Sequence, residues 1–342
     1  MKKLLLILAL LAAANSFFPT ASAQERPWMK YITPSGYMQA GFSMDDSFDN
    51  TFYIKRIRVA LAGALYEGDA GKLEYRMQAE MANSPKVTDF YVKYTVCDEF
   101  GIQFGQYKSP LSIENSEYAP LKLEMIDYSL MVQRFVKMST TDLSGISSTG
   151  REMGLQFVGG LFKMRDGHHL FRYNVAVFNG NGINKTDDDQ RKDFVARLMF
   201  FPIKDLNISG YYLRSLGPHP EVAPQYNDYD YFVFDRYGGG IAYDGKYAWF
   251  RSEYMAGHTF GWRSEGAYAT AGVKIASKWG IGARYDYFTT NSREAGHVQK
   301  YITGGISYYP VTRLRLQLNY SYKSDPGLTP THLVNFMTSI VL

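Results

Sequence analysis

RLRLQLNYSY, residues 313–322, alternates polar and apolar side chains without a break. Successive side chains of a β-strand point to opposite faces, so one face here carries Arg, Gln, Asn and Ser, and the other carries Leu and Tyr. The same alternation recurs at 73–80, 89–94, 152–157, 172–177 and 282–287. The pattern predicts an all-β protein whose strands have one polar and one apolar face.

A soluble sandwich would also alternate, but three features favour a transmembrane barrel. Charged residues occupy the middle of the polar faces, as in a water-filled lumen. Tyr and Phe gather at strand ends, where aromatic rings favour the membrane–water interfaces. Short turns alternate with long polar connections, as in outer-membrane barrels; the long ones lie near 43–50, 108–149, 179–191, 217–235, 289–297 and 323–331. A secreted soluble β-protein is the alternative.

The alternating blocks predict a closed antiparallel barrel of about sixteen strands in one domain. Closure is expected because an open edge in lipid would leave backbone N–H and C=O groups unpaired. The predicted spans are 35–43, 51–66, 72–82, 87–96, 100–107, 150–160, 170–178, 193–201, 205–214, 237–243, 246–257, 266–277, 279–288, 298–309, 312–322 and 332–342.

Residues 1–23 have the pattern of a secretory signal peptide: a basic start, an apolar stretch and the Ala-Ser-Ala cleavage site at 21–23. Cleavage would leave a barrel of residues 24–342 with 35 Lys and Arg against 33 Asp and Glu. High aromatic content and low net charge exclude disorder, and the single Cys97 excludes a disulfide framework. We expect export to the outer membrane of a Gram-negative cell.

The predicted third loop, Lys108 to Thr149, is longer than the other connections and rich in Leu, Ile, Met and Tyr. So much apolar surface must pack against something, and in a barrel the lumen wall is available. The loop is expected to fold inward and narrow the pore, with an outer cap as the alternative. Its candidate pore-facing charges are Glu114, Glu117, Glu124, Asp127, Arg134 and Lys137.

The N-terminal third resembles the phosphate-selective porin O and P family. The resemblance rests on FYIKRIRVALAG at 52–63, LEYRMQAE at 73–80, DFYV at 89–92 and GQYKSPLSIE at 105–114. It implies a sixteen-stranded outer-membrane channel, commonly a homotrimer, with its third loop in the pore. In some members of this family, Arg and Lys in the lumen bind phosphate.

Arg56 and Arg58 share one face of their strand, so both are expected in the lumen. Lys55 has the other parity and is expected at a bulge or at the membrane interface. Arginine can hold an oxyanion with two hydrogen bonds, and rings of Arg and Lys select anions. The predicted anion-binding or pore-lining residues are Arg56, Arg58, Lys108, Arg76, Lys93, Arg134, Arg313 and Arg315.

Carboxylates share these faces, so a non-selective general diffusion pore is an open alternative, as is a non-conducting barrel that acts as an adhesin or structural protein. The chain has no G-x-S-x-G motif and no metal-ligand spacing, so no enzyme activity, cofactor or metal is expected. The expected partners are outer-membrane lipid, lipopolysaccharide and small anionic or polar solutes, and not nucleic acid.

Overall fold

The computed structural model describes residues 31–187, 191–218, 231–259, 262–276 and 278–342, so the predicted signal peptide lies outside the described residues. This part of the chain forms sixteen β-strands and two short helices. Among the described residues, no helix is long and apolar enough to cross a bilayer. The elements are β1 Thr33–Asp45, β2 Asn50–Gly68, β3 Gly71–Glu80, β4 Lys86–Cys97, β5 Phe100–Lys108, α2 Ile113–Glu117, α3 Leu130–Phe135, β6 Arg151–Lys163, β7 His169–Phe178, β8 Asp193–Ile203, β9 Leu206–Pro218, β10 Tyr231–Asp244, β11 Ala248–Thr259, β12 Trp262–Ile275, β13 Trp279–Thr289, β14 Val298–Val311, β15 Leu314–Ser324 and β16 Thr331–Val341.

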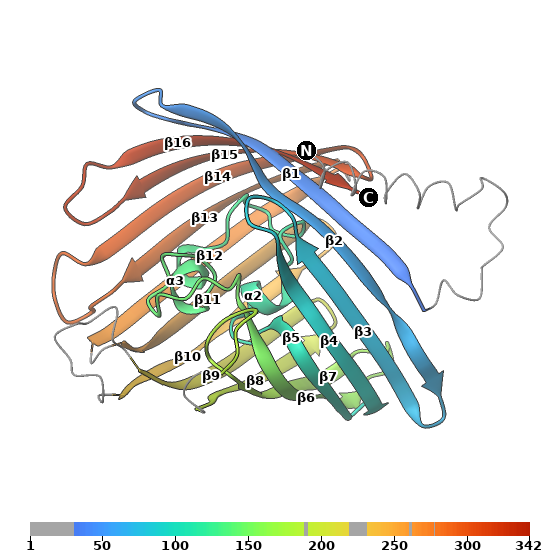
Figure 1. Cartoon of the computed structure of the whole chain (residues 1–342). Helices are drawn as coiled ribbons and strands as arrows, with labels where there is room; N and C mark the ends of the chain where they lie inside the picture. The colour runs from blue at the N-terminus through green and yellow to red at the C-terminus, as the bar shows by residue number, and fades with distance from the viewer. Residues whose placement is uncertain (1–30, 188–190, 219–230, 260–261, 277) are drawn as a thin grey trace.

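The strands form one closed ring (Figure 1). Each strand pairs antiparallel with its neighbours along the chain, and β1 pairs with β16 from Tyr37 opposite Val341 to Asp45 opposite Leu333. Closure pairs the strand edges, which in lipid would otherwise cost several kcal/mol for each unpaired group. The predicted sixteen-stranded antiparallel barrel is confirmed.

The barrel is polar inside and apolar outside. Along β15, Gln317 and Asn319 are 2% and 4% exposed, whereas Leu318 and Tyr320 are 48% and 50% exposed. A soluble protein would bury the leucines and expose the amides, so the soluble alternative is wrong. The outward apolar side chains are those that face lipid in a membrane barrel.

The strand ends differ from the prediction in two informative places. β10 begins at Tyr231 rather than 237, because Asp235 and Arg236 continue the ladder opposite His258 and Gly257 of β11. The polar residues of this stretch predict a loop, but strand pairing requires only backbone N–H and C=O groups, so polar side chains do not prevent it. β15 begins at Leu314, which leaves Arg313 exposed in the turn from β14, outside the predicted strand.

Candidate functional site

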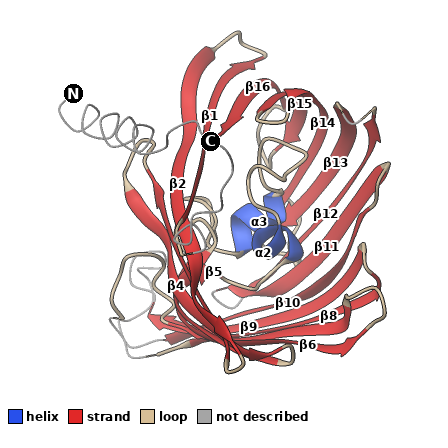
Figure 2. Ribbon diagram, turned by 90° about the vertical axis from the view of Figure 1, so that its right-hand side faces the viewer, coloured by secondary structure: helices blue, strands red, loops and turns tan. Residues whose placement is uncertain are grey.

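The third loop, residues 109–150 between β5 and β6, lies within the ring of strands and carries both helices (Figure 2). Its apolar side chains form one buried cluster with side chains of the wall. Met131 and Val132 of α3 are fully buried, and the ring of Phe135 lies 5.0 Å from that of Phe288 on β13. Removal of this apolar surface from water holds the loop against the wall.

A wall carboxylate holds the N-terminus of α2. Glu253 of β11 accepts hydrogen bonds from the N–H of Ile113 at 2.6 Å, the N–H of Glu114 at 2.9 Å and the hydroxyl of Ser112 at 3.0 Å. The hydroxyl of Tyr268 donates a fourth at 2.6 Å. The first N–H groups of a helix lack partners within the helix, and a carboxylate there satisfies them. Glu253 is 2% exposed and therefore serves as an anchor for the loop.

A second wall carboxylate holds α3. Asp286 of β13 accepts hydrogen bonds from the N–H of Leu130 at 2.9 Å and from Nε of Arg284 at 2.7 Å. Arg284 also donates to the backbone carbonyls of Asp127 and Tyr128, at 2.7 and 3.3 Å. Both helices of the loop therefore begin on carboxylates of the far wall.

Arg251 of β11 binds two separate parts of the loop. Its guanidinium group lies 3.1 Å from Oε1 of Glu114, 2.8 Å from Oε2 of Glu124 and 3.9 Å from the centroid of the Tyr118 ring. Arg251 and Glu114 are both fully buried. The sequence predicts Glu114 as a pore-facing charge, but the structure places it in this buried cluster, where removal of one partner would leave an uncompensated charge.

The loop returns to the wall through Lys137. Its ammonium group donates to Glu152 at 2.6 Å, to Asp193 at 2.9 Å and to the carbonyl of Gly180 at 2.6 Å. Burial favours the neutral amine, but the two carboxylates outweigh it and raise the pKa of Lys137 above its usual range. Lys137 is therefore a structural cation rather than a pore-facing one.

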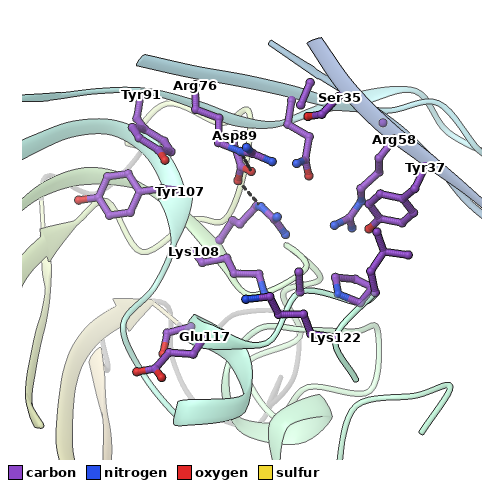
Figure 3. Close-up of a pocket in the computed structure, with 18 of the residues that line it drawn as sticks. Ser35, Tyr37, Arg58, Arg76, Asp89, Tyr91, Tyr107, Lys108, Glu117 and Lys122 are labelled. Carbon is purple, nitrogen blue, oxygen red and sulfur yellow. Dashed lines mark hydrogen bonds and ion pairs between the residues drawn. The ribbon is translucent and has the colours of Figure 1, made fainter. Parts of the chain in front are cut away.

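A cavity of about 470 Å³ lies between loop residues 116–122 and the inner faces of β1 to β6 (Figure 3). We name it the basic cavity, because among the described residues five Arg and Lys side chains and two carboxylates line it. These side chains are Arg58, Arg76, Lys108, Lys122 and Arg151, with Asp89 and Glu117. The surplus of positive charge makes this cavity the candidate site for an anion.

Two arginines share Asp89 of β4. Its carboxylate lies 2.6 Å from Nε of Arg151 and 3.3 Å from Nε of Arg76. On β2, Arg58 pairs with Glu80 at 2.9 Å. Three arginines therefore face two carboxylates, which leaves one positive charge uncompensated.

Lys108, at the end of β5, contributes no hydrogen-bond donor to the basic cavity. Its ammonium group donates to the carbonyls of Asn115 and Tyr118, at 2.6 and 3.2 Å, and to the hydroxyl of Tyr128 at 3.1 Å. All three N–H bonds thus go to neutral oxygens, and no carboxylate of the described chain pairs with it. The hydrogen bonds of Lys108 therefore hold the loop rather than reach a solute.

A β-bulge turns Lys55 toward the lumen. The register of β1 and β2 shifts so that Gln39 faces Arg56 and Ala40 faces Ile54, which leaves Lys55 unpaired in the ladder. Lys55 forms an ion pair with Asp127 of the loop, and Arg56 donates to Oε1 of Gln39 at 2.9 Å. The bulge is therefore the correct one of the two positions predicted for Lys55.

The charge of Asp127 is secured by its neighbours. Partial removal of this half-exposed carboxylate from water opposes ionisation, but the cations Lys55, Arg56 and Lys323 outweigh that effect and lower the pKa of Asp127 to about 2. The carboxyl group therefore stays ionised throughout the physiological range of pH.

The other predicted cations are dispersed. Lys93 lies half-buried on β4 without a side-chain partner in the part of the chain described. Arg134 of α3 donates to Oε1 of Gln299 at 3.0 Å, and Arg313 lies in its exposed turn. Arg315 of β15 lines a second cavity, between the loop and β11 to β15. Of the eight predicted residues, only Arg58, Arg76 and Lys108 line the basic cavity.

Sequence reasoning missed two cations of this cavity. Arg151 has the parity of Met153, so alternation places it on the apolar face, yet it is 3% exposed and bound to Asp89. Lys122 is an exposed residue of the loop, and no pattern singles it out. In the described residues no group of three or more His, Cys, Asp or Glu could hold a metal ion.

Solved structures of outer-membrane channels share this fold at low sequence identity. The anion-selective porin from Comamonas acidovorans has a TM-score of 0.68 and 12% identity, and the alignment covers 91% of this chain and 99% of that chain. The outer membrane channel DcaP of Acinetobacter baumannii has a TM-score of 0.67 and 13% identity, and the alignment covers 91% of this chain and 97% of that chain. OmpT of Vibrio cholerae, in a trimer form, has a TM-score of 0.66 and 12% identity, and the alignment covers 91% of this chain and 99% of that chain.

No curated protein matches the sequence. The family model described as phosphate-selective porin O and P matches residues 35–229 and 256–330. This match includes the third loop and the strands that line the basic cavity. The chain therefore belongs to the phosphate-selective porin O and P family, as its sequence resemblance indicates, and forms an outer-membrane porin channel.

Proposed function

We propose that this porin is a passive channel that favours small anions, inorganic phosphate foremost, and that the basic cavity is where they bind. One observation carries the proposal: among the described residues, five Arg and Lys side chains against two carboxylates line that cavity. The chain after residue 23 is nearly neutral, so the surplus is local. A surplus of Arg and Lys in a pore attracts anions and repels cations.

The arginines keep donors for a solute. Arg58 and Arg76 each use Nε on a carboxylate, and within the described chain their Nη groups make no hydrogen bond. A guanidinium group with free Nη atoms can donate two bonds to an oxyanion. Lys122, exposed and without a side-chain partner among the described residues, supplies a third cation. Together these groups match the charge and the acceptor oxygens of phosphate.

The general diffusion pore is the second candidate, and much of the wall fits it. Arg197 forms an ion pair with Glu117, Arg284 with Asp286 and Lys274 with Asp244. Such pairs cancel and give no selectivity. The basic cavity departs from this pattern, which favours the anion channel. A non-conducting adhesin or structural barrel would differ from both by its lack of conductance.

We further propose that residues 1–23 direct export, that the mature chain is 24–342, and that it assembles as a homotrimer. The trimer form of the similar Vibrio cholerae porin supports the assembly. The outward apolar side chains would meet membrane lipid, and the long polar loops would meet lipopolysaccharide. We also propose that the protein has no cofactor, no enzyme activity and no nucleic-acid partner.

The test is block of chloride current by phosphate in planar bilayers. We expect phosphate at millimolar concentration or below to reduce the current. Lys122→Gln removes one cation next to the solute, which is worth about 1 kcal/mol in water and should raise the half-blocking concentration roughly fivefold. Arg76→Lys keeps the charge but removes the fork and should also weaken the block. Lys204→Gln, the same change at an exposed turn, is the matched control.

The outcomes separate the three candidates. Chloride current that phosphate leaves unchanged at tens of millimolar would establish the general pore and overturn the proposed selectivity. A protein that never raises conductance would be the non-conducting barrel. Equal effects of Lys122→Gln and Lys204→Gln would show that the basic cavity is not the site.

A further inference from the structure

The second cavity, of about 630 Å³, lies between loop residues 118–125 and the inner faces of β11 to β15. Its wall includes the apolar and aromatic side chains of Leu121, Met125, Trp249 and Tyr309. We name it the aromatic cavity. Leu121 and Lys122 line both this cavity and the basic cavity, so the two lie on either side of the same part of the loop.

Glycines make the floor of the aromatic cavity. A Cβ at Gly282 would come within 2.7 Å of the Trp249 ring, and one at Gly305 within 2.7 Å of Sδ of Met125. Both side chains therefore lie directly on bare backbone. At Gly280 a Cβ would meet its nearest neighbour, Trp249, only at 3.7 Å, so the floor stays open there. At Gly280, Gly282 and Gly305 the inner wall therefore has no side chain to fill the cavity.

A buried, uncompensated cation borders the hollow. Arg315 is 7% exposed, and its donors go to neutral oxygens: Oγ of Ser307 at 2.9 Å and the carbonyls of Leu121 and Glu124 at 3.0 and 3.3 Å. No carboxylate of the described residues lies within 4.0 Å of its guanidinium group. A buried charge is costly unless it is paired, so a bound anion would compensate Arg315.

The apolar surface adjoins this charge. Tyr309 is 37% exposed, and its ring centroid lies 5.4 Å from Cζ of Arg315. Two more cations of the lining, Lys122 and Lys246, are exposed and have no carboxylate partner in the described part of the chain. By contrast, Lys274 is neutralised by Asp244. An aromatic face and unpaired cations are thus within reach of one small molecule.

We propose that the aromatic cavity is a second binding site, for organic anions that carry a ring. The acid group would be held by Arg315 and Lys122, and the ring would lie against Tyr309 over the open floor at Gly280. This inference rests on the anion selectivity proposed above and extends its solutes to ring-bearing phosphate monoesters. Lys122 lines both cavities and would connect the two sites.

The test compares block of chloride current by phenyl phosphate with block by inorganic phosphate. Contacts of the ring with the cavity wall stabilise the bound ester, so we expect phenyl phosphate to block at roughly tenfold lower concentration. Gly280→Val fills the floor without a backbone clash and should abolish this difference. Gly304→Val is the matched control, because it adds the same group on the outward face, where a Cβ meets nothing within 4 Å. Both variants are first shown to conduct chloride.

Equal block by the two compounds in the wild type would overturn this inference and leave the phosphate channel in place. Retention of the phenyl phosphate preference in Gly280→Val would also overturn it. Failure of both compounds to block would instead refute the anion selectivity on which the inference rests. Loss of the preference in Gly280→Val alone, with Gly304→Val unchanged, supports it.

Discussion

Replacement of Glu253 by Gln should release the N-terminus of α2 while the barrel stays closed. The carboxylate accepts four hydrogen bonds, two of them from backbone N–H groups of the loop. A glutamine can keep Oε1 against Ser112 and Glu114, but its NH₂ group would then face the N–H of Ile113. Two donors would meet where a carboxylate oxygen accepts a bond at 2.6 Å.

The free-energy cost of this substitution comes mainly from the lost hydrogen bond between the N–H of Ile113 and Glu253. Loss of a charge-assisted hydrogen bond costs about 1.5 to 3 kcal/mol, and the unsatisfied N–H adds about 1 to 3 kcal/mol. The neutral amide regains part of this, since a buried carboxylate is itself costly. We expect a net cost of about 2 to 4 kcal/mol, which corresponds to roughly 30- to 1,000-fold in the equilibrium for local opening.

Amide hydrogen exchange measures this opening directly. In Glu253→Gln, exchange of a peptide spanning 113–117 should accelerate by that factor, while the strands keep their protection. The single-channel current should become noisier, because the loop moves in the lumen. Glu294→Gln, at a side chain that is 67% exposed between β13 and β14, is the control. Unchanged exchange at 113–117 would refute the anchoring role of Glu253.

Three further predictions concern the loop and the orientation of the barrel. Asp127→Asn removes a half-exposed carboxylate and frees Lys55, so the anion-to-cation permeability ratio should rise roughly threefold. Burial raises the pKa of Asp142 to about 6, so its folded form binds a proton more tightly than the unfolded chain. As pH rises through 4 to 6 the loop should lose up to about 3 kcal/mol, seen as faster exchange at pH 7.5 than at pH 5 after correction for intrinsic rates. Cys97 is exposed at a short turn, so a large maleimide reagent should label it only after the outer membrane is broken.

Each of these three predictions would be contradicted by a specific result. A permeability ratio that falls in Asp127→Asn would mean that Lys55 does not face the solute path. Asp142→Asn should abolish the pH dependence of exchange, and its persistence would assign that dependence to another group. Labelling of Cys97 in intact cells would place the short turns outside the cell.

The fold could be predicted because every strand obeys the same rule. Lipid requires an apolar outer face and water requires a polar inner face, so alternation in stretches such as 313–322 marks a strand and its orientation together. The rule weakens at strand ends beyond the membrane. There β10 extends to Tyr231 through polar residues, and Arg313 falls into a turn.

The site could be predicted only in part, because alternation gives a face and not a partner. Arg58 and Arg76 were placed correctly on the inner face. Glu253 also lies on the inner face, but its bond to Ser112 joins residues 141 positions apart, and no local pattern reports such a contact. The same reason hides the difference between Glu114, which is buried on Arg251, and Lys122, which is free to meet a solute.

The reversal potential in a KCl gradient tests the central claim most directly. With the purified protein in a planar bilayer and about a tenfold gradient, we expect a potential with the sign of the chloride equilibrium potential. It should move toward zero in Lys122→Gln. A potential with the sign of potassium, or a bilayer whose conductance never rises, would contradict the anion channel.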